Sequence, residues 1–210
     1  LIDITKDAQF ELFDYKYSKC KGIRSYNPFP VINNTSIDNA VELINKAKKP
    51  FIVWGQGVIL GNAEIEFKDF VEKSGIPAAW TILGLSALPT SHELNVGMVG
   101  MHGNYGPNIL TNECDLLIAV GMRFDDRVTG DPNTYASQAK IIHLDIDPAE
   151  INKNINVDVP VIGDCKESLK LITKKIQNKT HGKWISRFDD LMKIEFEKVI
   201  NSDLNPVKDG

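Results

Sequence analysis

Short, mainly apolar runs alternate with amphipathic segments along most of the chain. The apolar runs lie at 51–54, 77–80, 116–120, 141–145 and 158–162. Runs of this length without a regular polar face are typical of parallel strands that are buried on both sides. Because helical segments separate them, the pattern predicts an α/β fold with a doubly wound, mostly parallel sheet of five or six strands.

The segments between the runs carry apolar residues at helical spacing. The first helix is predicted to begin at a cap formed by Thr35 or Ser36 and to end before Pro50. The second is predicted to stop at Gly75, since glycine readily takes the left-handed conformation that ends many helices. Further helices are predicted around 109–111, 169–176 and 184–199, with a loop at 83–89.

The polar ends of the chain predict three parts. We interpret residues 1–34 as the end of a preceding domain, with a strand end at 1–4, followed by a linker that drapes over a neighbour. Residues 35–180 are the central domain, and residues 181–210 are a C-terminal helix and a frayed linker toward a third domain. The chain starts without methionine in what looks like a strand end, so we expect a piece of a longer protein.

The composition narrows the class of protein. The chain is 42% hydrophobic and 25% charged, which is typical of a soluble globular protein. Its formal net charge of −4 gives no reason to expect nucleic acid or an anionic membrane as a partner. The cysteines Cys20, Cys114 and Cys165 are far apart and lack zinc spacing, so we expect a reducing, cytoplasmic location, most simply bacterial. No apolar run is long enough to span a bilayer.

The stretch 114–130, CDLLIAVGMRFDDRVTG, joins the most apolar run to a charged turn. In open α/β sheets, ligands bind beyond the carboxyl ends of the strands. Arg123, Asp125, Asp126 and Arg127 would then stand at the rim of a ligand crevice. A surface turn whose charges neutralise one another explains the same pattern equally well.

A glycine cluster follows the first apolar run, with Gly55, Gly57 and Gly61 in the order G-x-G-x-x-x-G. The third glycine is one place late for a nicotinamide dinucleotide fingerprint. No acidic residue ends the next strand, where Thr81 stands, so a standard nicotinamide site is disfavoured. The glycines permit either a close backbone approach to a phosphate or a plain tight turn.

Two further segments offer candidate binding residues. The glycine-rich loop with Met101 and His102 could lie against a flat ring, and nothing pairs His102 with a nucleophile or a metal ligand. Asp145 ends a strand and could accept from a ribose hydroxyl or an adenine amino group. Asp147 and Glu150 are better explained as a helix cap and a capping-box partner. We find no catalytic or metal-binding constellation, so the residues alone predict a nucleotide-binding module.

Several strings resemble one family. GMHG, AVGMRFDDRVTG, IIHLDIDP and GD resemble the central domain of the acetolactate synthase (acetohydroxyacid synthase) family, large catalytic subunit, within the thiamine-diphosphate enzymes. LIDITKD resembles the end of that family's first domain, and residues 35–178 resemble its middle domain. RFDDRVTG is the most specific of these strings.

The resemblance implies a Rossmann-like domain of the DHS-like NAD/FAD-binding type that holds FAD in an extended form. The FAD is largely structural, because the family condenses two 2-keto acids (pyruvate with pyruvate or 2-ketobutyrate) with decarboxylation, in branched-chain amino-acid biosynthesis, and this is not a net redox reaction. Thiamine diphosphate and magnesium belong to the full-length enzyme. Its implied partners are other domains of the same polypeptide, a second copy in a homodimer or tetramer, and a possible small regulatory subunit.

The resemblance also implies roles for residues at matching positions. The phosphates and ribitol would lie by Gly55, Gln56 and Gly57. The flavin side would be bordered by Thr81, Ile82 and Leu83 and by Val99, Gly100, Met101, His102 and Gly103. The pyrophosphate and ribose would be held by Gly121, Met122, Arg123, Asp125, Arg127 and Val128. The adenine end would be taken by Asp145 and Ile146, with Asp164 and Cys165 nearby. The substrate channel would include Met101, Asp126 and Arg127.

The family's thiamine-activating glutamate and its GDG…N magnesium motif lie in its first and third domains and do not occur in these residues. We therefore expect no catalytic residue and no synthase activity in this chain by itself. Three alternatives stay open: the central domain of another thiamine-diphosphate carboligase or oxidase, an NAD-binding enzyme, and an interaction module that has lost its ligand. A sirtuin-type deacylase would need four zinc-binding cysteines, and the chain has three cysteines.

Overall fold

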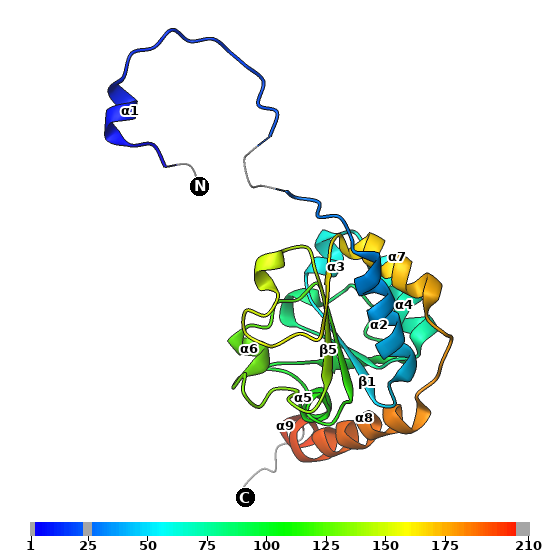
Figure 1. Cartoon of the computed structure of the whole chain (residues 1–210). Helices are drawn as coiled ribbons and strands as arrows, with labels where there is room; N and C mark the ends of the chain where they lie inside the picture. The colour runs from blue at the N-terminus through cyan, green and yellow to red at the C-terminus, as the bar shows by residue number, and fades with distance from the viewer. Residues whose placement is uncertain (1–2, 23–26, 205–210) are drawn as a thin grey trace, which may run out of the picture.

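The computed structural model describes residues 3–22 and 27–204, in which a six-stranded sheet lies between layers of helices (Figure 1). The strands are β1 (Pro50–Trp54), β2 (Ala78–Trp80), β3 (Asn95–Met98), β4 (Leu116–Val120), β5 (Lys140–Asp145) and β6 (Val159–Ile162). The α-helices are α1 (Lys6–Phe10), α2 (Asn34–Lys46), α3 (Gly57–Leu60), α4 (Glu64–Ser74), α5 (Tyr105–Thr111), α6 (Asp126–Thr129), α7 (Cys165–Lys175), α8 (Gly182–Glu195) and α9 (Asn201–Leu204). Short 3₁₀ turns η1 (Ile82–Gly84) and η2 (Pro148–Glu150) and a π-helical turn η3 (Phe196–Ile200) complete the described elements.

Every described strand pairing is parallel, and the strand order is β3-β2-β1-β4-β5-β6. The central pair β1 and β4 is in register along its whole length, with Val53 opposite Ala119. Both strands are buried at every position, as expected for a parallel sheet covered on two sides. The predicted α/β class and doubly wound parallel sheet are therefore confirmed.

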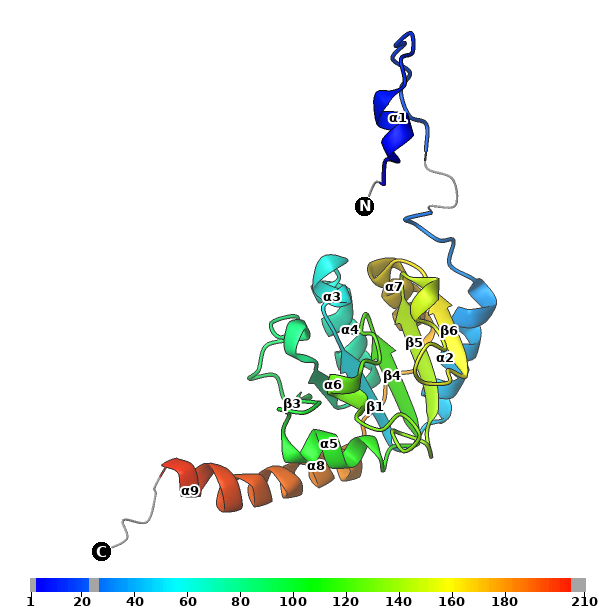
Figure 2. The same cartoon turned by 90° about the vertical axis from the view of Figure 1, so that its left-hand side faces the viewer.

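Alternate residues of each strand feed two separate cores. Ile52 and Trp54 of β1 pack with the buried residues of α2, α4 and α7 on one face. Phe51 and Val53 face the other side, where Phe188 of α8 packs against Phe51 at 5.2 Å between ring centroids. Figure 2 shows α8 at the end of the sheet where the strands begin, continuing through η3 into α9. The opposite end, where the strands finish, is left to loops and short helices.

Several predicted boundaries are confirmed and others were wrong. Gly75 ends α4 in the left-handed conformation, at φ +62°. The cap of α2 is Asn33, whose side chain accepts from the Thr35 backbone N–H at 2.8 Å, so Thr35 and Ser36 lie inside the helix. Asn33, Thr35 and Ser36 all carry side-chain oxygens that can cap a helix, so residue type alone does not show which of them caps α2.

The sequence pattern also missed some elements. The pattern predicts no strand at β3, because this edge strand is short and contains Gly97, a residue that weakens the strand pattern. The strand end expected at 1–4 is not a strand at residues 3–4, the short helix α1 follows in the expected linker, and residues 1–2 lie outside the described part of the chain. The expected frayed tail starts as helix α9, and residues 205–210 again lie outside the description.

Candidate functional site

The point where the strand order reverses lies between β1 and β4. From β1 the chain moves outward to β2 and β3, then returns to the other side of β1 and continues through β4, β5 and β6. The loops after β1 and β4 therefore diverge at the carboxyl edge of the sheet, and ligands of doubly wound folds bind in the crevice that such loops leave. The glycine cluster and the charged turn of the sequence both fall at this position.

The two loops are held together by direct backbone contact. The Gly57 N–H donates to the Gly121 carbonyl at 2.8 Å, and the Gly55 N–H donates to the Val120 carbonyl at 3.0 Å. A Cβ at Gly57 would lie 2.6 Å from the Gly121 Cα, and Gly121 has φ +57°. These glycines are thus required by loop-to-loop packing, a reason that neither the phosphate nor the tight-turn interpretation included. Gly61 has a similar packing role, since a Cβ there would lie 3.3 Å from the Cys165 Cβ.

A hollow of about 360 Å³ opens above these loops. Its lining comes from the ends of four neighbouring strands and includes most of the predicted cofactor residues: Gly55, Gln56, Gly57, Thr81, Ile82, Leu83, Gly121, Met122, Arg123, Asp125, Arg127, Val128 and Asp145. Strands in a sheet lie about 4.8 Å apart, so the ends of four strands extend over roughly 14 Å. The hollow therefore suits an elongated ligand that lies across the edge of the sheet.

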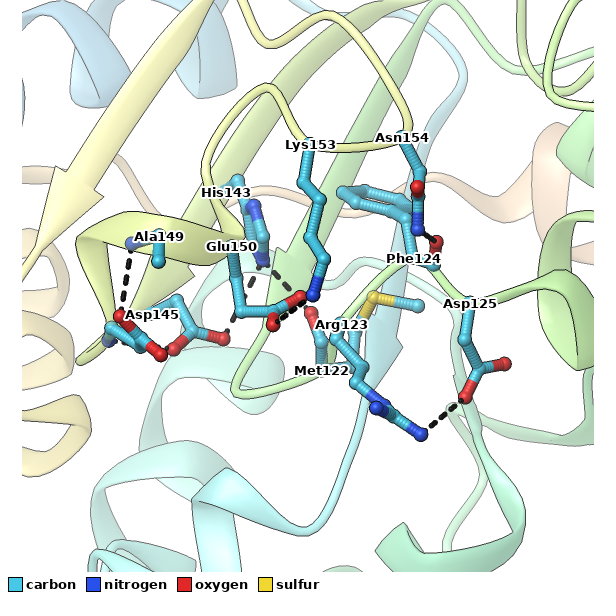
Figure 3. Close-up of polar contacts among 11 residues, drawn as sticks. Met122, Arg123, Phe124, Asp125, His143, Asp145, Ala149, Glu150, Lys153 and Asn154 are labelled. Atoms are coloured by element: carbon cyan, nitrogen blue, oxygen red, sulfur yellow. Dashed lines mark hydrogen bonds and ion pairs between the residues drawn. The ribbon is translucent and has the colours of Figure 1, made fainter. Parts of the chain in front are cut away.

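Arg123 is one of two arginines, with Arg127, that line the hollow on its β4 side. Its Nη2 lies 3.3 Å from Asp125 Oδ2, and the arginine side chain is 66% exposed. Asp125 also caps α6, because its Oδ1 accepts from the Arg127 backbone N–H at 3.1 Å. The loop is therefore stiffened by an ion pair and a helix cap, while most of the guanidinium is left available for an anion (Figure 3).

The β5 side of the hollow carries two carboxylates. Asp145 Oδ1 accepts from the Asp147 backbone N–H at 2.9 Å. Asp147 in turn caps η2 by accepting from the Ala149 N–H at 2.9 Å, as predicted. The predicted capping-box role of Glu150 was wrong, since its carboxylate pairs with Lys153 at 2.7 Å and lines the hollow. The Asp147 N–H that a capping box would engage is already bonded to Asp145.

The glycine-rich loop at 99–103 does not line the hollow. It contacts α6, which lies beside the hollow. The Met101 N–H donates to the Arg127 carbonyl at 2.8 Å, and Arg127 Nη1 lies 4.0 Å from Met101 Sδ. Met101 and Arg127, both predicted channel residues, are thus neighbours. The remaining residues of this group are Val99, which is buried, Gly100 and Gly103, which are half-buried, and His102 and Asp126, which are exposed.

Three residues predicted near the adenine end also lie outside the hollow. Ile146 is exposed. Asp164 caps α7 by accepting from the Glu167 N–H at 3.0 Å. Burial, with the charges of Asp164 and Asp145, raises the pKa of the Cys165 thiol to about 12, so this thiol is neutral at physiological pH.

Three residues of the site were not predicted. Leu60 and Glu150 line the hollow, and His143 is buried directly beneath it. In the sequence, His143 is a polar residue between Ile142 and Leu144 in an otherwise apolar strand, and this position is the feature that could have marked it as a site residue. No cluster of three or more potential metal ligands occurs among residues 3–22 and 27–204, and no helix in that part is long and apolar enough to cross a membrane.

Comparison with known families identifies the family of the chain. Residues 37–172 match the model of the thiamine pyrophosphate enzyme central domain, and the chain belongs to this family. Within the family it is similar to acetolactate synthase large subunits. It is 44% identical to that of Corynebacterium glutamicum over 194 residues, which is 92% of this chain and 31% of the relative.

Two archaeal relatives named as probable acetolactate synthase large subunits are similar as well. The protein of Methanocaldococcus jannaschii is 39% identical over 215 residues, 99% of this chain and 36% of the relative. That of Methanococcus aeolicus is 46% identical over 179 residues, 83% of this chain and 30% of the relative. The chain thus spans about a third of the length of these relatives.

Proposed function

We propose that the hollow between β1 and β4 binds FAD, and that the chain serves as the FAD-binding central domain of an acetolactate synthase large subunit. The single observation that carries this proposal is the position of Arg123 beside the packed glycine loops at the strand-order reversal. A guanidinium matches two phosphate oxygens and keeps its charge at any working pH. Arg123, with the loop backbone, would hold the pyrophosphate.

The two ends of the hollow favour a flavin dinucleotide over a nicotinamide one. At the β2 end, where a nicotinamide fold would place an acidic residue, the exposed side chains are Ile82 at 70% and Leu83 at 61%. An apolar, exposed rim suits a flat ring system. At the β5 end, Asp145 and Glu150 offer acceptors for hydroxyl or amino groups.

In the proposed enzyme, FAD has a structural role and gives no electrons to the net condensation of two 2-keto acids. Residues 3–34 and 181–204 would connect this domain to other domains of the same polypeptide, and the full-length enzyme would be a cytoplasmic homodimer or tetramer, with or without a regulatory subunit. Side chains such as Phe10, Leu12 and Phe196 are exposed and apolar, as expected of surfaces that partners cover. Thiamine diphosphate and magnesium would be held outside this domain.

The test is a titration of the purified chain with FAD, followed by flavin fluorescence and by the visible spectrum. We expect saturable binding that NAD does not compete away. A folded protein that leaves FAD free in solution contradicts the proposal, and binding of NAD in preference to FAD favours the alternative nicotinamide module. As a second check, the chain supplied with pyruvate, thiamine diphosphate, magnesium and FAD should form no acetolactate above a heat-killed control.

A further inference from the structure

His143 is a completely buried polar side chain in the middle of β5. Its neighbours Ile142 and Leu144 belong to the core on the α2, α4 and α7 side, so His143 faces the opposite side of the sheet. There its ring meets Phe124 edge to face, at 4.9 Å between centroids. A buried imidazole among apolar side chains is costly unless its nitrogens find partners, which indicates a specific role.

The imidazole reaches across to the loop that follows β4. Nε2 lies 2.8 Å from the Met122 carbonyl oxygen. A carbonyl only accepts, so Nε2 carries the hydrogen and donates it. Nδ1 is buried and has no hydrogen-bond partner, which is consistent with a neutral ring protonated on Nε2 alone. The Met122 carbonyl belongs to the peptide that continues directly into Arg123.

The same nitrogen also faces the other side of the hollow. Nε2 lies 3.6 Å from Asp145 Oδ2, while Asp145 Oδ1 is occupied by the Asp147 N–H. Figure 3 shows the ring between the Met122 carbonyl and the Asp145 carboxylate, with Arg123 leaving the loop just beyond Met122. One N–H group therefore lies between the peptide that precedes Arg123 and the carboxylate of Asp145, and both residues line the hollow.

We propose that His143 is a positioning residue that fixes the Arg123 loop and Asp145 relative to each other, so that one dinucleotide can meet both. This inference rests on the proposed function of the hollow. The hydrogen bond to Met122 sets the direction in which Arg123 leaves the strand. The electrostatic attraction of the same N–H for Asp145 Oδ2 favours the orientation of the carboxylate that lines the hollow. Support of this kind, from a buried group behind the contact residues, determines how well a site is organised before its ligand arrives.

Two variants separate the donor from the bulk of the ring. His143→Gln keeps an N–H donor at about the reach of Nε2, whereas His143→Leu fills similar space without any donor. We expect His143→Leu to weaken FAD binding roughly three- to tenfold, the effect of one lost hydrogen bond, and His143→Gln to restore most of it. Equal weakening by both variants would contradict the inference, since it would point to packing alone.

A double-mutant cycle tests whether His143 acts through Arg123. In the Arg123→Ala background, His143→Leu should weaken FAD binding by a smaller factor than in the wild-type background, because one of the two side chains that it positions is gone. Additive losses would overturn the proposal and leave His143 with a general structural role.

Two measurements on the protein without FAD test the positioning role of His143 independently of whether the hollow binds FAD. Nitrogen NMR of the His143 ring should show a proton on Nε2 and none on Nδ1. Hydrogen exchange at the amides of Arg127, Val128 and Gly130 should speed up in His143→Leu and stay near the wild-type rate in His143→Gln. If the chain binds no FAD but both results hold, the dinucleotide assignment fails and the positioning role stands. If either result is absent, the positioning role fails whatever the ligand.

Discussion

The two ends of the sheet use the same kinds of side chain differently. At the amino end, Asp115 accepts from the Lys48 and Lys49 backbone N–H groups at 2.8 and 2.9 Å, so both carboxylate oxygens bind the two residues that precede β1. At the carboxyl end, Asp145 has one oxygen bonded to the backbone and borders the hollow. Strand beginnings present unpaired N–H groups, and acceptors placed there are used to build the fold.

Helix coverage strengthens the difference between the two ends. Trp184 of α8 lies against the amino end and donates from Nε1 to the Pro50 carbonyl at 2.8 Å. At the carboxyl end, glycines bring the loops together through their backbones, and side chains of the β4 loop such as Arg123 line the hollow. Side chains therefore cover the amino end of the sheet. At the carboxyl end the loops contact one another through their backbones, and a hollow remains above them that can bind a ligand.

The largest expected effect comes from Gly121→Ala, which would break the backbone closure. The new Cβ would lie 2.7 Å from the Gly57 Cα, and the residue already has φ +57°. We expect the free energy of unfolding to fall by roughly 3 kcal/mol, from overpacking and left-handed strain together. Gly130→Ala is the matched control, because φ is +58° and no atom lies within 4 Å of its Cβ position. The strain of that backbone, at φ +58° and ψ −119°, should cost about 1–2 kcal/mol without any new contact. Equal losses in urea denaturation would mean that the loop contact adds nothing.

Arg123→Ala tests the open side chains of the carboxyl end. It should weaken FAD binding roughly 10- to 100-fold, the effect of losing a hydrogen bond to a charged group. Arg127→Ala should weaken it much less, because we place Arg127 toward the substrate channel, yet it should cripple a full-length enzyme. Arg187→Ala removes the ion pair between Arg187 of α8 and Glu113. It is a control at the amino end of the sheet and should leave FAD binding unchanged. Flavin fluorescence gives the three dissociation constants, and equal losses for Arg123 and Arg127 would show that the loop orientation is wrong.

Asp115→Ala and Asp145→Ala compare the two aspartates directly. Asp115→Ala should lower the free energy of unfolding by about 2 kcal/mol, since two backbone N–H groups lose a charged acceptor. Asp145→Ala removes one such acceptor and should cost about 1 kcal/mol in stability, with a measurable loss of FAD affinity as well. Denaturation and FAD titration of both variants decide the matter; an Asp145 variant less stable than its Asp115 counterpart would reverse our assignment of roles.

The smallest effect concerns the pH dependence at the amino end. Burial, aided by the charge of Lys179, lowers the pKa of His181 below its ordinary value of 6.5, against the opposing influence of Asp115. The unfolded chain therefore binds more protons than the folded one below about pH 6.5. Stability from this residue is fully present above that pH and is lost as the pH falls toward the lowered pKa. Unfolding curves at pH 7.5 and 5.5 should differ less in His181→Gln than in the wild type. An unchanged difference would exclude His181 as the cause.

The sequence by itself predicted most of the strands and the positions along the chain where a ligand site is expected. Apolar runs without a polar face identify β1, β4 and β5 as buried parallel strands because burial on two sides is a local compositional property. Residues such as Arg123 and Asp145, each just beyond or at the end of such a run, were then expected near a ligand, since carboxyl ends of parallel strands share one edge. The string RFDDRVTG added the family, which the comparisons confirm.

The tertiary structure decided how these pieces meet. That Gly57 lies against Gly121, that Asp115 caps β1, and that His143 reaches under the Met122 carbonyl all depend on which strands are neighbours. Strand order arises from pairings between residues far apart in the chain, and periodicity within a window carries no information about them. For the same reason Asp115 and Asp145, each an aspartate at one end of an apolar strand, look alike in sequence. Only the folded protein shows that Asp115 binds the backbone just before β1 while Asp145 lines the hollow.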